Sequence, residues 1–529
     1  MTIRRRDLLA LAGLLGAGSV LGPTGAVRAG MTTPPYRGPM KLDGAPKKTS
    51  VLVLGAGLAG LTAAYELRNA GYQVQLLEYN NRIGGRSWTL RGGDVYTELG
   101  GEKQICEFAP GVYMNPGPWR ISHTHKAILD YCKRFGVALE PFVQLNYAGY
   151  VHSRNVLGGK PQRYAHVAAD FQGYLAEMMT AALSKGGLDQ PLAPEHLALL
   201  KPMLASWGGL DGSGRYVTGA SSSRLRGPES ISFEDASITY SQLLKFADVL
   251  QLGEDAAMWR GANHPGLASF QTTLFQPVGG MDMIPKAFAS RLPGVIRTNA
   301  RVLSMTQDES RVTVTYEDVS RPGSSLQASA NWCICTIPLS ILGQLELRIG
   351  APMKAAIDAI SYSSETKIGL QFRRRFWEED EGIFGGFSIT DLPIRQIFYP
   401  SGGLNTPGPG LLYGAVLHRG PPTYEFTGMT PAERVRRAVE YGAQIHPQYH
   451  KEFQNGMAVA WHRNPYTMGC NAQWTPDLIR KHHANARAID GRFVLAGEGV
   501  SGHGWQDGAI MSALEVVERL HRRIVAAVR

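Results

Sequence analysis

The feature that most constrains the fold is a set of three glycines between a predicted strand and a predicted helix. The apolar run 50–54 is typical of a buried strand, and the apolar spacing over 58–70 predicts a helix. Gly55, Gly57 and Gly60 stand at the junction in the pattern G-x-G-x-x-G. The first glycine allows a tight turn, the second lets a pyrophosphate approach the backbone, and the third lets helix and strand pack closely. The free N–H groups at the helix start add a site for phosphate.

A carboxylate completes this unit. The run 73–77 predicts a second strand, and Glu78 follows it, roughly 20 residues after the first glycine, where an acidic side chain binds ribose hydroxyls. A strand, a helix and a second strand in this order indicate an α/β fold with a parallel sheet. The sequence therefore predicts a bound dinucleotide, without separating NAD from FAD.

Length and composition narrow the class of protein. A chain of 529 residues is too long for one compact core, and 44% hydrophobic with 19% charged residues is typical of a globular protein. The net charge of +10 comes from scattered basic residues, so no nucleic-acid partner is expected. The five cysteines have no metal-ligand spacing, and Cys333 and Cys335 in an apolar run predict small buried side chains. We therefore expect no bound metal.

The first 29 residues predict an export signal. Arg4-Arg5-Arg6 precedes the apolar stretch 10–21, and Val27-Arg28-Ala29 offers small residues to a signal peptidase. This arrangement resembles a twin-arginine signal, which implies a folded, exported protein that is periplasmic or secreted. An ordinary secretory signal and an uncleaved anchor are the alternatives. No later segment has the roughly 18 uninterrupted apolar residues of a membrane span, so a mature form without a membrane segment is expected.

Further motifs favour FAD. Arg82-Ile83-Gly84-Gly85-Arg86 is a second glycine pair beside an arginine, just after the carboxylate. Near the chain end, Phe493-Val494-Leu495-Ala496-Gly497-Glu498 is an apolar strand that closes in Gly-Glu, and Gly504-Trp505-Gln506-Asp507-Gly508-Ala509-Ile510 opens the last helix. Together with Pro277-Val278-Gly279-Gly280-Met281-Asp282 and Val302, these segments resemble the flavin amine oxidase family.

This resemblance covers nearly everything after Lys48 and implies a fold. The expected fold is α/β, with an FAD-binding Rossmann-like domain, a mixed-sheet substrate domain and a helical insertion. The expected boundaries are residues 1–29 for the signal, 48–87, 275–360 and 487–529 for the FAD-binding domain, 88–160 and 361–486 for the substrate domain, and 161–274 for the helical domain.

The resemblance also implies how FAD is held. The arginine of the second glycine motif meets the pyrophosphate, the closing glutamate binds the ribityl chain, and the last helix points its N-terminus at the flavin. Some family members attach FAD through a cysteine, but none lies in 497–510 and Cys470 is well upstream, so non-covalent FAD is expected. The cofactor-binding residues so implied are Gly55, Ala56, Gly57, Leu58, Ala59, Gly60, Glu78, Tyr79, Gly85, Arg86, Gly117, Pro118, Trp119, Arg120, Val302, Glu498, Gly504, Trp505, Gln506, Asp507, Gly508 and Ala509.

Two residues point to an amino acid substrate. Gly117-Pro118-Trp119-Arg120 resembles a segment of the L-amino acid oxidase group, in which the arginine pairs with the substrate carboxylate. A guanidinium suits this role because its planar fork matches two oxygens. Tyr413 stands where that group has a tyrosine hydroxyl on the same carboxylate. The alternatives are an arginine paired to a buried acid and a tyrosine that only packs in the core.

The remaining expected site residues surround the amine. Lys367 is similar to a family lysine that holds a water near the flavin, and its alternative is a solvated strand lysine. Trp505 and Gly504 would form a wall beside the substrate, or Trp505 would simply cap the last helix. Several L-amino acid oxidases place a histidine over the substrate. No histidine here aligns well, and His264 is the nearest candidate.

The resemblance implies an L-amino acid oxidase. Such an enzyme transfers a hydride from Cα to FAD N5, the imino acid hydrolyses to a 2-oxo acid and ammonia, and O2 is reduced to H2O2. The alternatives are an amine or polyamine oxidase, an amino acid 2-monooxygenase of the same fold, and a flavin-loaded binding protein without turnover. The sequence does not give the side-chain preference or the oligomeric state, and a homodimer is one of the states it leaves open.

Overall fold

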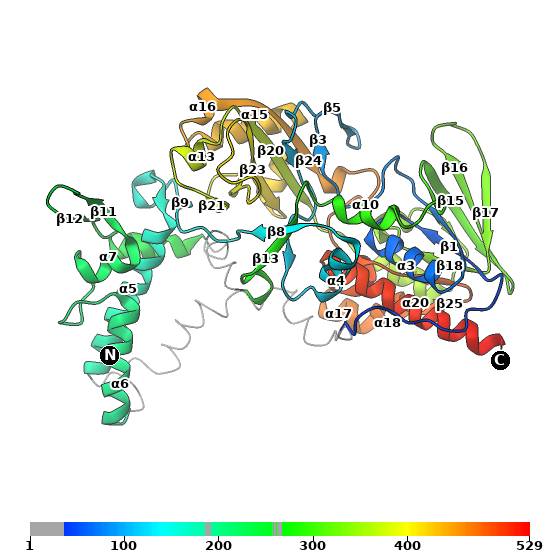
Figure 1. Ribbon diagram of the computed structural model, residues 1–529, viewed down its shortest axis with the longest axis horizontal. Helices are drawn as coiled ribbons and strands as arrows, with labels where there is room; N and C mark the ends of the chain where they lie inside the picture. The colour runs from blue at the N-terminus through cyan, green and yellow to red at the C-terminus, as the bar shows by residue number, and fades with distance from the viewer. Residues whose placement is uncertain (1–35, 186–191, 256–257, 259–260, 262–266, 529) are drawn as a thin grey trace.

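The computed structural model describes residues 36–185, 192–255, 258, 261 and 267–528. The predicted signal at 1–29 and the candidate His264 lie outside these ranges. Within them, no helix has both the length and the apolar character that a membrane crossing needs. The molecule is elongated, with a helical lobe at one end, a large sheet in the middle and the glycine turn at the other end (Figure 1).

A six-stranded sheet carries the glycine turn. Its order is β14-β2-β1-β18-β26-β25, and all neighbours are parallel except β25 and β26. The strands are β14 (Ile296–Arg297), β2 (Gln73–Leu77), β1 (Ser50–Leu54), β18 (Trp332–Cys335), β26 (Phe493–Leu495) and β25 (Ile489–Asp490). This confirms the predicted α/β class with a parallel sheet, and it assembles that sheet from segments far apart in the sequence.

Side chains alternate along each strand, so the two faces of this sheet pack against different elements. Val51 packs with helices α3 (Leu58–Asn69) and α20 (Gln506–Val528). Leu52 and Leu54 face the other way, toward a four-stranded sheet in the order β17-β16-β15-β19. Its strands are β17 (Leu326–Ala330), β16 (Val312–Asp318), β15 (Ala300–Gln307) and β19 (Glu346–Leu347). Figure 1 shows α3 and α20 side by side below the sheet.

A seven-stranded mixed sheet forms the middle of the molecule. Its order is β10-β9-β21-β22-β23-β20-β24, and every residue of β20 is buried. The strands are β10 (Gln162–Arg163), β9 (Tyr150–His152), β21 (Gly386–Thr390), β22 (Gln396–Tyr399), β23 (Gly410–His418), β20 (Glu365–Phe372) and β24 (Phe453–Ala460). Helix α15 (Pro431–Gly442) covers one side. The buried strand β20 carries Lys367 to the boundary between the two large sheets.

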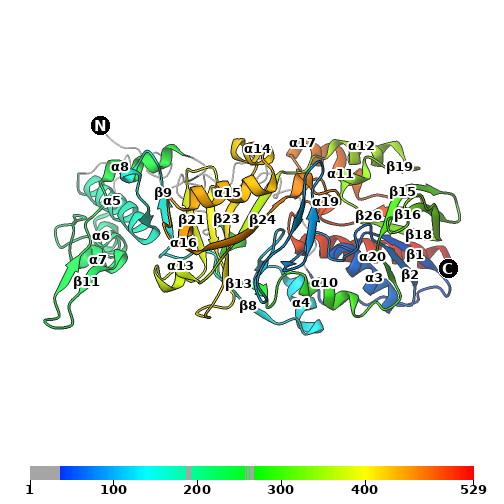
Figure 2. The same cartoon turned by 90° about the horizontal axis from the view of Figure 1, so that it is seen from above.

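The helical lobe stands apart at the far end in both views (Figures 1 and 2). It contains α5 (Tyr164–Ser184), α6 (Pro194–Gly208), α7 (Ala220–Arg226), α8 (Phe246–Gln251) and the hairpin of β11 (Pro228–Ile231) and β12 (Ile238–Tyr240). The helical spacing at 168–183 and 194–204 predicts helices there, and the structure confirms both and extends them to Tyr164–Ser184 and Pro194–Gly208.

Smaller elements connect these parts. The short strands are β3 (Leu90–Arg91), β4 (Val95–Thr97), β5 (Lys103–Ile105), β6 (Tyr113–Met114), β7 (Ile121–Ser122), β8 (Leu139–Phe142) and β13 (Leu274–Pro277). The helices are α4 (Lys126–Phe135), α10 (Met283–Ala289), α11 (Leu339–Leu342), α12 (Ala351–Ala359), α13 (Phe376–Glu379), α14 (Pro421–Thr427), α16 (Tyr449–Glu452), α17 (Pro476–Leu478), α18 (Ala484–Ala486) and α19 (Glu498–Ser501). Single turns of helix are η1 (Leu157–Gly159), η2 (Leu252–Glu254), η4 (Ala268–Phe270), η5 (Trp461–Arg463) and η6 (Ile479–His483).

One predicted strand is wrong in its extent. The apolar run 330–336 predicts one strand, but the chain changes sheets at Asn331, because β17 ends at Ala330 and β18 begins at Trp332. The Asn331 side chain accepts hydrogen bonds from the backbone N–H and the hydroxyl of Ser50, at 2.9 and 3.0 Å. A polar residue that ties two sheets together therefore breaks the run. Cys333 and Cys335 are buried in β18, as predicted.

Candidate active site

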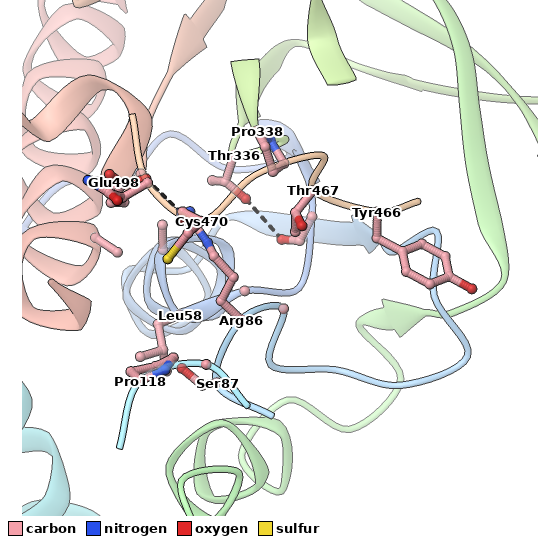
Figure 3. A pocket seen from close by; sticks show the side chains of 18 of the residues that line it. Leu58, Arg86, Ser87, Pro118, Thr336, Pro338, Tyr466, Thr467, Cys470 and Glu498 are labelled. Carbon is pink, nitrogen blue, oxygen red and sulfur yellow. Dashed lines mark hydrogen bonds and ion pairs between the residues drawn. The ribbon is translucent and has the colours of Figure 1, made fainter. Parts of the chain in front are cut away.

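A cavity of about 580 Å³ lies where the glycine turn, the second glycine motif and the start of α20 meet. Figure 3 shows Leu58 and Pro118 on one side of it, with Cys470 and Glu498 across from them. The wall is made by the carboxyl end of the six-stranded sheet and by residues of the seven-stranded sheet. In open parallel sheets this edge is where ligands bind.

The glycines of the turn are required by close contacts. Gly55 has a φ of +97°, which disfavours any other residue, and a Cβ on Gly60 would lie 1.9 Å from the Gly55 carbonyl oxygen. A Cβ on Gly57 would meet nothing within 4 Å, because this residue faces the cavity. The turn is thus packed tightly behind and open in front, as a cradle for phosphate requires.

Glu78 is held by the same turn. Its Oε2 accepts a hydrogen bond from the Ala56 N–H at 2.7 Å, and its Oε1 accepts one from the Asn80 N–H at 2.8 Å. Burial raises the pKa of Glu78, and these two N–H donors oppose that rise. The carboxylate is therefore fixed at the cavity wall, beside the end of β2.

A partly buried ion pair joins the second glycine motif to the end of the chain. Arg86 contacts Glu498 at 2.7 Å and also donates to the carbonyl oxygen of Cys470. The second oxygen of Glu498 accepts a hydrogen bond from the Ala472 N–H at 3.0 Å. Figure 3 shows Arg86 extending up the cavity toward Glu498. The two motifs that resemble the flavin family therefore meet in space.

The start of α20 closes one end of the cavity. Trp505, Gln506 and Ala509 line it, and the Gln506 side chain donates to the Ser87 hydroxyl at 2.8 Å. Asp507 points away and accepts a hydrogen bond from the Ile128 N–H at 2.9 Å. The helix N-terminus consequently faces the cavity, where it favours negative charge.

Arg120 is a cation surrounded by aromatic rings. Its Cζ lies 4.4 Å from the ring centre of Phe270, 5.6 Å from that of Trp505 and 5.7 Å from that of Trp119. In the part of the chain that the structure describes, no carboxylate forms an ion pair with it, and its Nε has no hydrogen-bond partner. Burial lowers the pKa of Arg120 to about 9, so the guanidinium stays charged at neutral pH. The cavity wall thus holds a cation ready for an anionic ligand.

Lys367 lies on the next part of the wall. Its Nζ is 3.8 Å from the centre of the Trp119 ring, 3.1 Å from Glu365 Oε1, and donates to the Gly117 carbonyl oxygen. Burial lowers the pKa of Lys367, and the Glu365 carboxylate opposes that shift. The lysine is therefore a held, buried group and is not the solvated strand residue of the alternative interpretation.

Tyr413 does not reach the cavity. Its ring packs edge-on against Trp119 with 4.8 Å between ring centres, and its hydroxyl accepts a hydrogen bond from the Asn115 N–H at 2.8 Å. Trp119 therefore stands between Tyr413 and Arg120. The register of β23 explains this position, because Tyr413 pairs across to Gly369 and Phe398 in the sheet interior.

Most of the residues that the sequence singles out come together at this cavity. Those that line it are Gly55, Gly57, Leu58, Ala59, Glu78, Tyr79, Gly85, Arg86, Gly117, Pro118, Trp119, Arg120, Val302, Lys367, Glu498, Gly504, Trp505, Gln506 and Ala509. The predicted residues that do not line it are Ala56, Gly60, Tyr413, Asp507 and Gly508.

The sequence reasoning missed several lining residues. Glu365 could have been found, since it stands two positions before Lys367 on a strand and so shares its face. Thr336 also had a signal, because it follows a buried parallel strand. Phe270 had none, as it lies in the single helical turn η4, whose contact with the site depends on tertiary packing. The other missed positions include Ser87, Pro338, His418, Tyr466, Thr467, Cys470, Asn471, Ala472 and Trp474.

These residues fit a flavin dinucleotide. The open face of Gly57 and the N-terminus of α3 suit a pyrophosphate. Glu78 lines the cavity after β2, where a carboxylate can bind the ribose hydroxyls. The N-terminus of α20 suits the ring edge that becomes negative on reduction. Arg120 lines the same cavity as these groups.

Comparison with known proteins agrees with this geometry. Residues 58–521 match the family model described as flavin containing amine oxidoreductase. The L-amino-acid oxidase of Vipera ammodytes ammodytes is 28% identical over 491 residues, which cover 90% of this chain and 94% of that protein. The L-amino-acid oxidase of Daboia russelii is 28% identical over 493 residues, or 90% of each. A solved putrescine oxidase bound to putrescine gives a TM-score of 0.59 at 16% identity, covering 91% of this chain and 100% of that one, and so shares the fold.

Proposed function

The chain belongs to the family of flavin-containing amine oxidoreductases, and from this premise we propose that it is an FAD-dependent L-amino acid oxidase. The observation that carries the proposal is Arg120, a cation at the cavity wall with no ion-pair partner among the described residues. An amine without a carboxylate would leave this half-buried cation without an ion-pair partner, stabilised only by the more distant Glu365 charge. An α-amino acid supplies the matching anion one bond from the carbon that is oxidised.

Substrate orientation follows from this pair. The Arg120 guanidinium would bind the substrate carboxylate through two hydrogen bonds, which fixes the position of the Cα–H bond. When bound, FAD would supply the acceptor for the Cα hydride and the route by which two electrons reach O2, which yields H2O2. Tyr413 acts through Trp119, whose ring it supports from behind. The imino acid product then hydrolyses to a 2-oxo acid and ammonia.

The same residues favour the reactive form of the amine. A substrate amine must be neutral to lose a hydride, and exclusion of water lowers its pKa. Phe270, Trp119 and Trp505 form an aromatic surround that excludes water around Arg120. The charged Lys367 disfavours a second ammonium nearby and would stabilise negative charge that develops as O2 is reduced.

The proposed FAD is non-covalent. Cys470 lines the cavity, but its thiol donates to Glu365 Oε2 at 2.6 Å and burial raises its pKa, so it is held protonated. The thiolate is the nucleophilic form, and this environment disfavours it. Acid precipitation of the protein should release all yellow colour into the supernatant. Flavin that remained in the pellet would contradict the proposal.

A peroxide assay tests the function directly. The purified protein is supplied with each of the twenty L-amino acids, with several D-forms, and with the amines that correspond to the L-amino acids after loss of their carboxylate. We expect peroxide and a 2-oxo acid from at least one L-amino acid, and far less from its amine. Turnover of amines alone would indicate an amine or polyamine oxidase. Release of CO2 with an amide product would indicate a monooxygenase.

We also propose that the protein is exported through its twin-arginine-type signal, on the basis of Arg4, Arg5 and the apolar stretch that follows. Arg4→Lys with Arg5→Lys should retain the protein in the cytoplasm while its flavin content stays unchanged. Export of this variant at the normal rate would favour the ordinary secretory signal.

A further inference from the structure

Glu365 is a carboxylate that the proposed function does not use, although it lies in the wall of the same cavity. It is the first residue of β20, and its side chain is 9% exposed. Lys367 follows on the same face of the strand, with 3% of its side chain exposed. Two ions are therefore buried side by side at the place where the substrate would react.

Both oxygens of Glu365 are engaged. Oε1 lies 3.1 Å from Lys367 Nζ, and Oε2 accepts a hydrogen bond from the Cys470 thiol and lies 3.5 Å from His418 Nδ1. The His418 side chain is 59% exposed, so it joins this cluster to solvent. The carboxylate is thus oriented by three groups, each from a different segment of the chain.

Other charged groups near Lys367 do not replace this carboxylate. From the loop before β7, Arg120 faces the lysine and repels its charge. From the loop after η5, Cys470 contacts Glu365 and is held as a thiol. From the end of β23, His418 faces Glu365. On β20 itself, Glu365 is the carboxylate within ion-pair distance of Lys367 among the described residues.

A buried ammonium needs such a partner. Transfer of Lys367 from water into this wall favours its neutral form, and an opposite charge at hydrogen-bond distance favours the charged form. The lysine also contacts the face of Trp119, which stabilises a cation more than a neutral amine. The protonation state of Lys367 is therefore balanced between burial and its carboxylate neighbour.

We propose that Glu365 is a positioning residue that keeps Lys367 protonated and fixed against Trp119 during turnover. The effect of Glu365 on the charge of Lys367 does not depend on the proposed function. Its importance for catalysis does, because that charge matters to turnover only where this cavity is the oxidase site. Loss of Glu365 would free the lysine to lose its proton and to leave its place over the Trp119 ring.

The test is a pH titration of the flavin-loaded protein without substrate. Tryptophan fluorescence reports the contact of Lys367 with Trp119, and flavin absorbance reports charge in the cavity. In Glu365→Gln we expect the spectral transition to move to lower pH, with proton affinity reduced by a factor of about ten or more. In the double variant Glu365→Gln with Lys367→Arg that transition should be absent, because an arginine does not deprotonate in this range. Glu425→Gln, which changes an exposed carboxylate, should titrate like the wild type.

A wild-type midpoint in Glu365→Gln would overturn the proposal, and so would a shift that persists with arginine at position 367. If Glu365→Gln fails to fold or to retain flavin, Glu365→Asp keeps the charge with a shorter reach and should shift the transition in the same direction by a smaller amount. No shift in this variant would also contradict the proposal. Since no substrate is present, failure of the peroxide assay and failure of this titration are separate results.

Discussion

Arg120 makes the amino acid specificity testable at the scale of one residue. We expect Arg120→Ala to lower kcat/KM for L-amino acids by about 30-fold to several thousand-fold, because a buried charge pair of about 2–5 kcal/mol is lost. Most of this loss should appear in KM. Steady-state kinetics with the best substrate measures it.

His123→Ala provides the control, since His123 is an exposed residue three positions further along the chain, on the other side of β7. It should leave both kinetic parameters unchanged. Activity toward the decarboxylated amine should not fall in Arg120→Ala. Equal kinetics of Arg120→Ala and wild type would remove Arg120 from the substrate site.

Asp507 gives a pH dependence of stability. Burial raises its pKa from 3.8 to about 6 in the folded protein. Between these values the folded state binds more protons than the unfolded state, so the free energy of unfolding should fall as pH rises from about 4 to 6 and then level off. The size of the effect is about 1–3 kcal/mol. Urea unfolding at several pH values measures it.

Asp507→Asn should abolish this pH dependence, because the amide oxygen can still accept from Ile128 N–H but does not titrate. Glu518→Gln, on the exposed side of the same helix, should keep the wild-type slope. A slope that survives in Asp507→Asn would assign the effect to another group.

At this scale the sequence predicts residues in motifs better than residues that act through packing. Arg120 and Lys367 stand in recognisable segments, and both line the cavity. Tyr413 does not line the cavity, because the Trp119 side chain packs against it and lines the cavity instead. No sequence pattern shows which of two aromatic side chains that pack together in the fold faces a ligand. Phe270 could not be predicted, since its contact with Arg120 is made between segments about 150 residues apart in the sequence.

At the scale of elements, the turn between β1 and α3 contains two glycines with different roles. Gly60 is needed for close packing, and Gly57 faces the cavity. Gly60→Ala should destabilise the protein by about 1–3 kcal/mol, because the added methyl group meets the Gly55 carbonyl. This outcome reverses the usual gain from alanine in a helix. Thermal unfolding measures the loss.

Gly57→Ala should behave differently. The added methyl group enters open space at a residue with extended backbone, so the fold should keep its stability within about 1 kcal/mol, while flavin retention falls because the methyl group occupies the phosphate cradle. The ratio of flavin to protein after gel filtration distinguishes the two variants. Full flavin content in Gly57→Ala would show that the dinucleotide does not approach this turn.

Elements were predictable where local pattern and tertiary packing agree. The units β1, α3 and β2 follow their sequence patterns within one residue. The last helix begins at Gln506, within the segment 504–510 that the sequence places at its start. Its first turn is anchored by Ser87 and Ile128, which lie far away in the sequence. The strand break at Asn331 likewise depends on a distant partner, Ser50.

At the scale of the whole molecule, the segment after the predicted signal packs against the core. Met40 and Leu42 pack beside α3 and α20, His521 Nε2 lies 3.0 Å from the Asp43 carbonyl oxygen, and Tyr36 donates to Asp130. A chain that starts at residue 46 should therefore unfold about 2–6 °C lower than one that starts at residue 36, through lost apolar burial and hydrogen bonds. Differential scanning calorimetry of the two flavin-loaded proteins makes the comparison. Equal melting temperatures would show that this segment contributes nothing to stability.

The six-stranded sheet is completed by β26, which is contributed by residues 493–495, and is covered by α20. During synthesis, the nascent chain must therefore leave the ribosome almost entirely before β18 gains its last parallel neighbour. Until then the edge of β18 is open to pairing with other chains, which is a route to aggregation. Capture of the proposed FAD should consequently be a late event in the life of each molecule, and a premature stop codon before β26 should produce a protein that never acquires flavin colour.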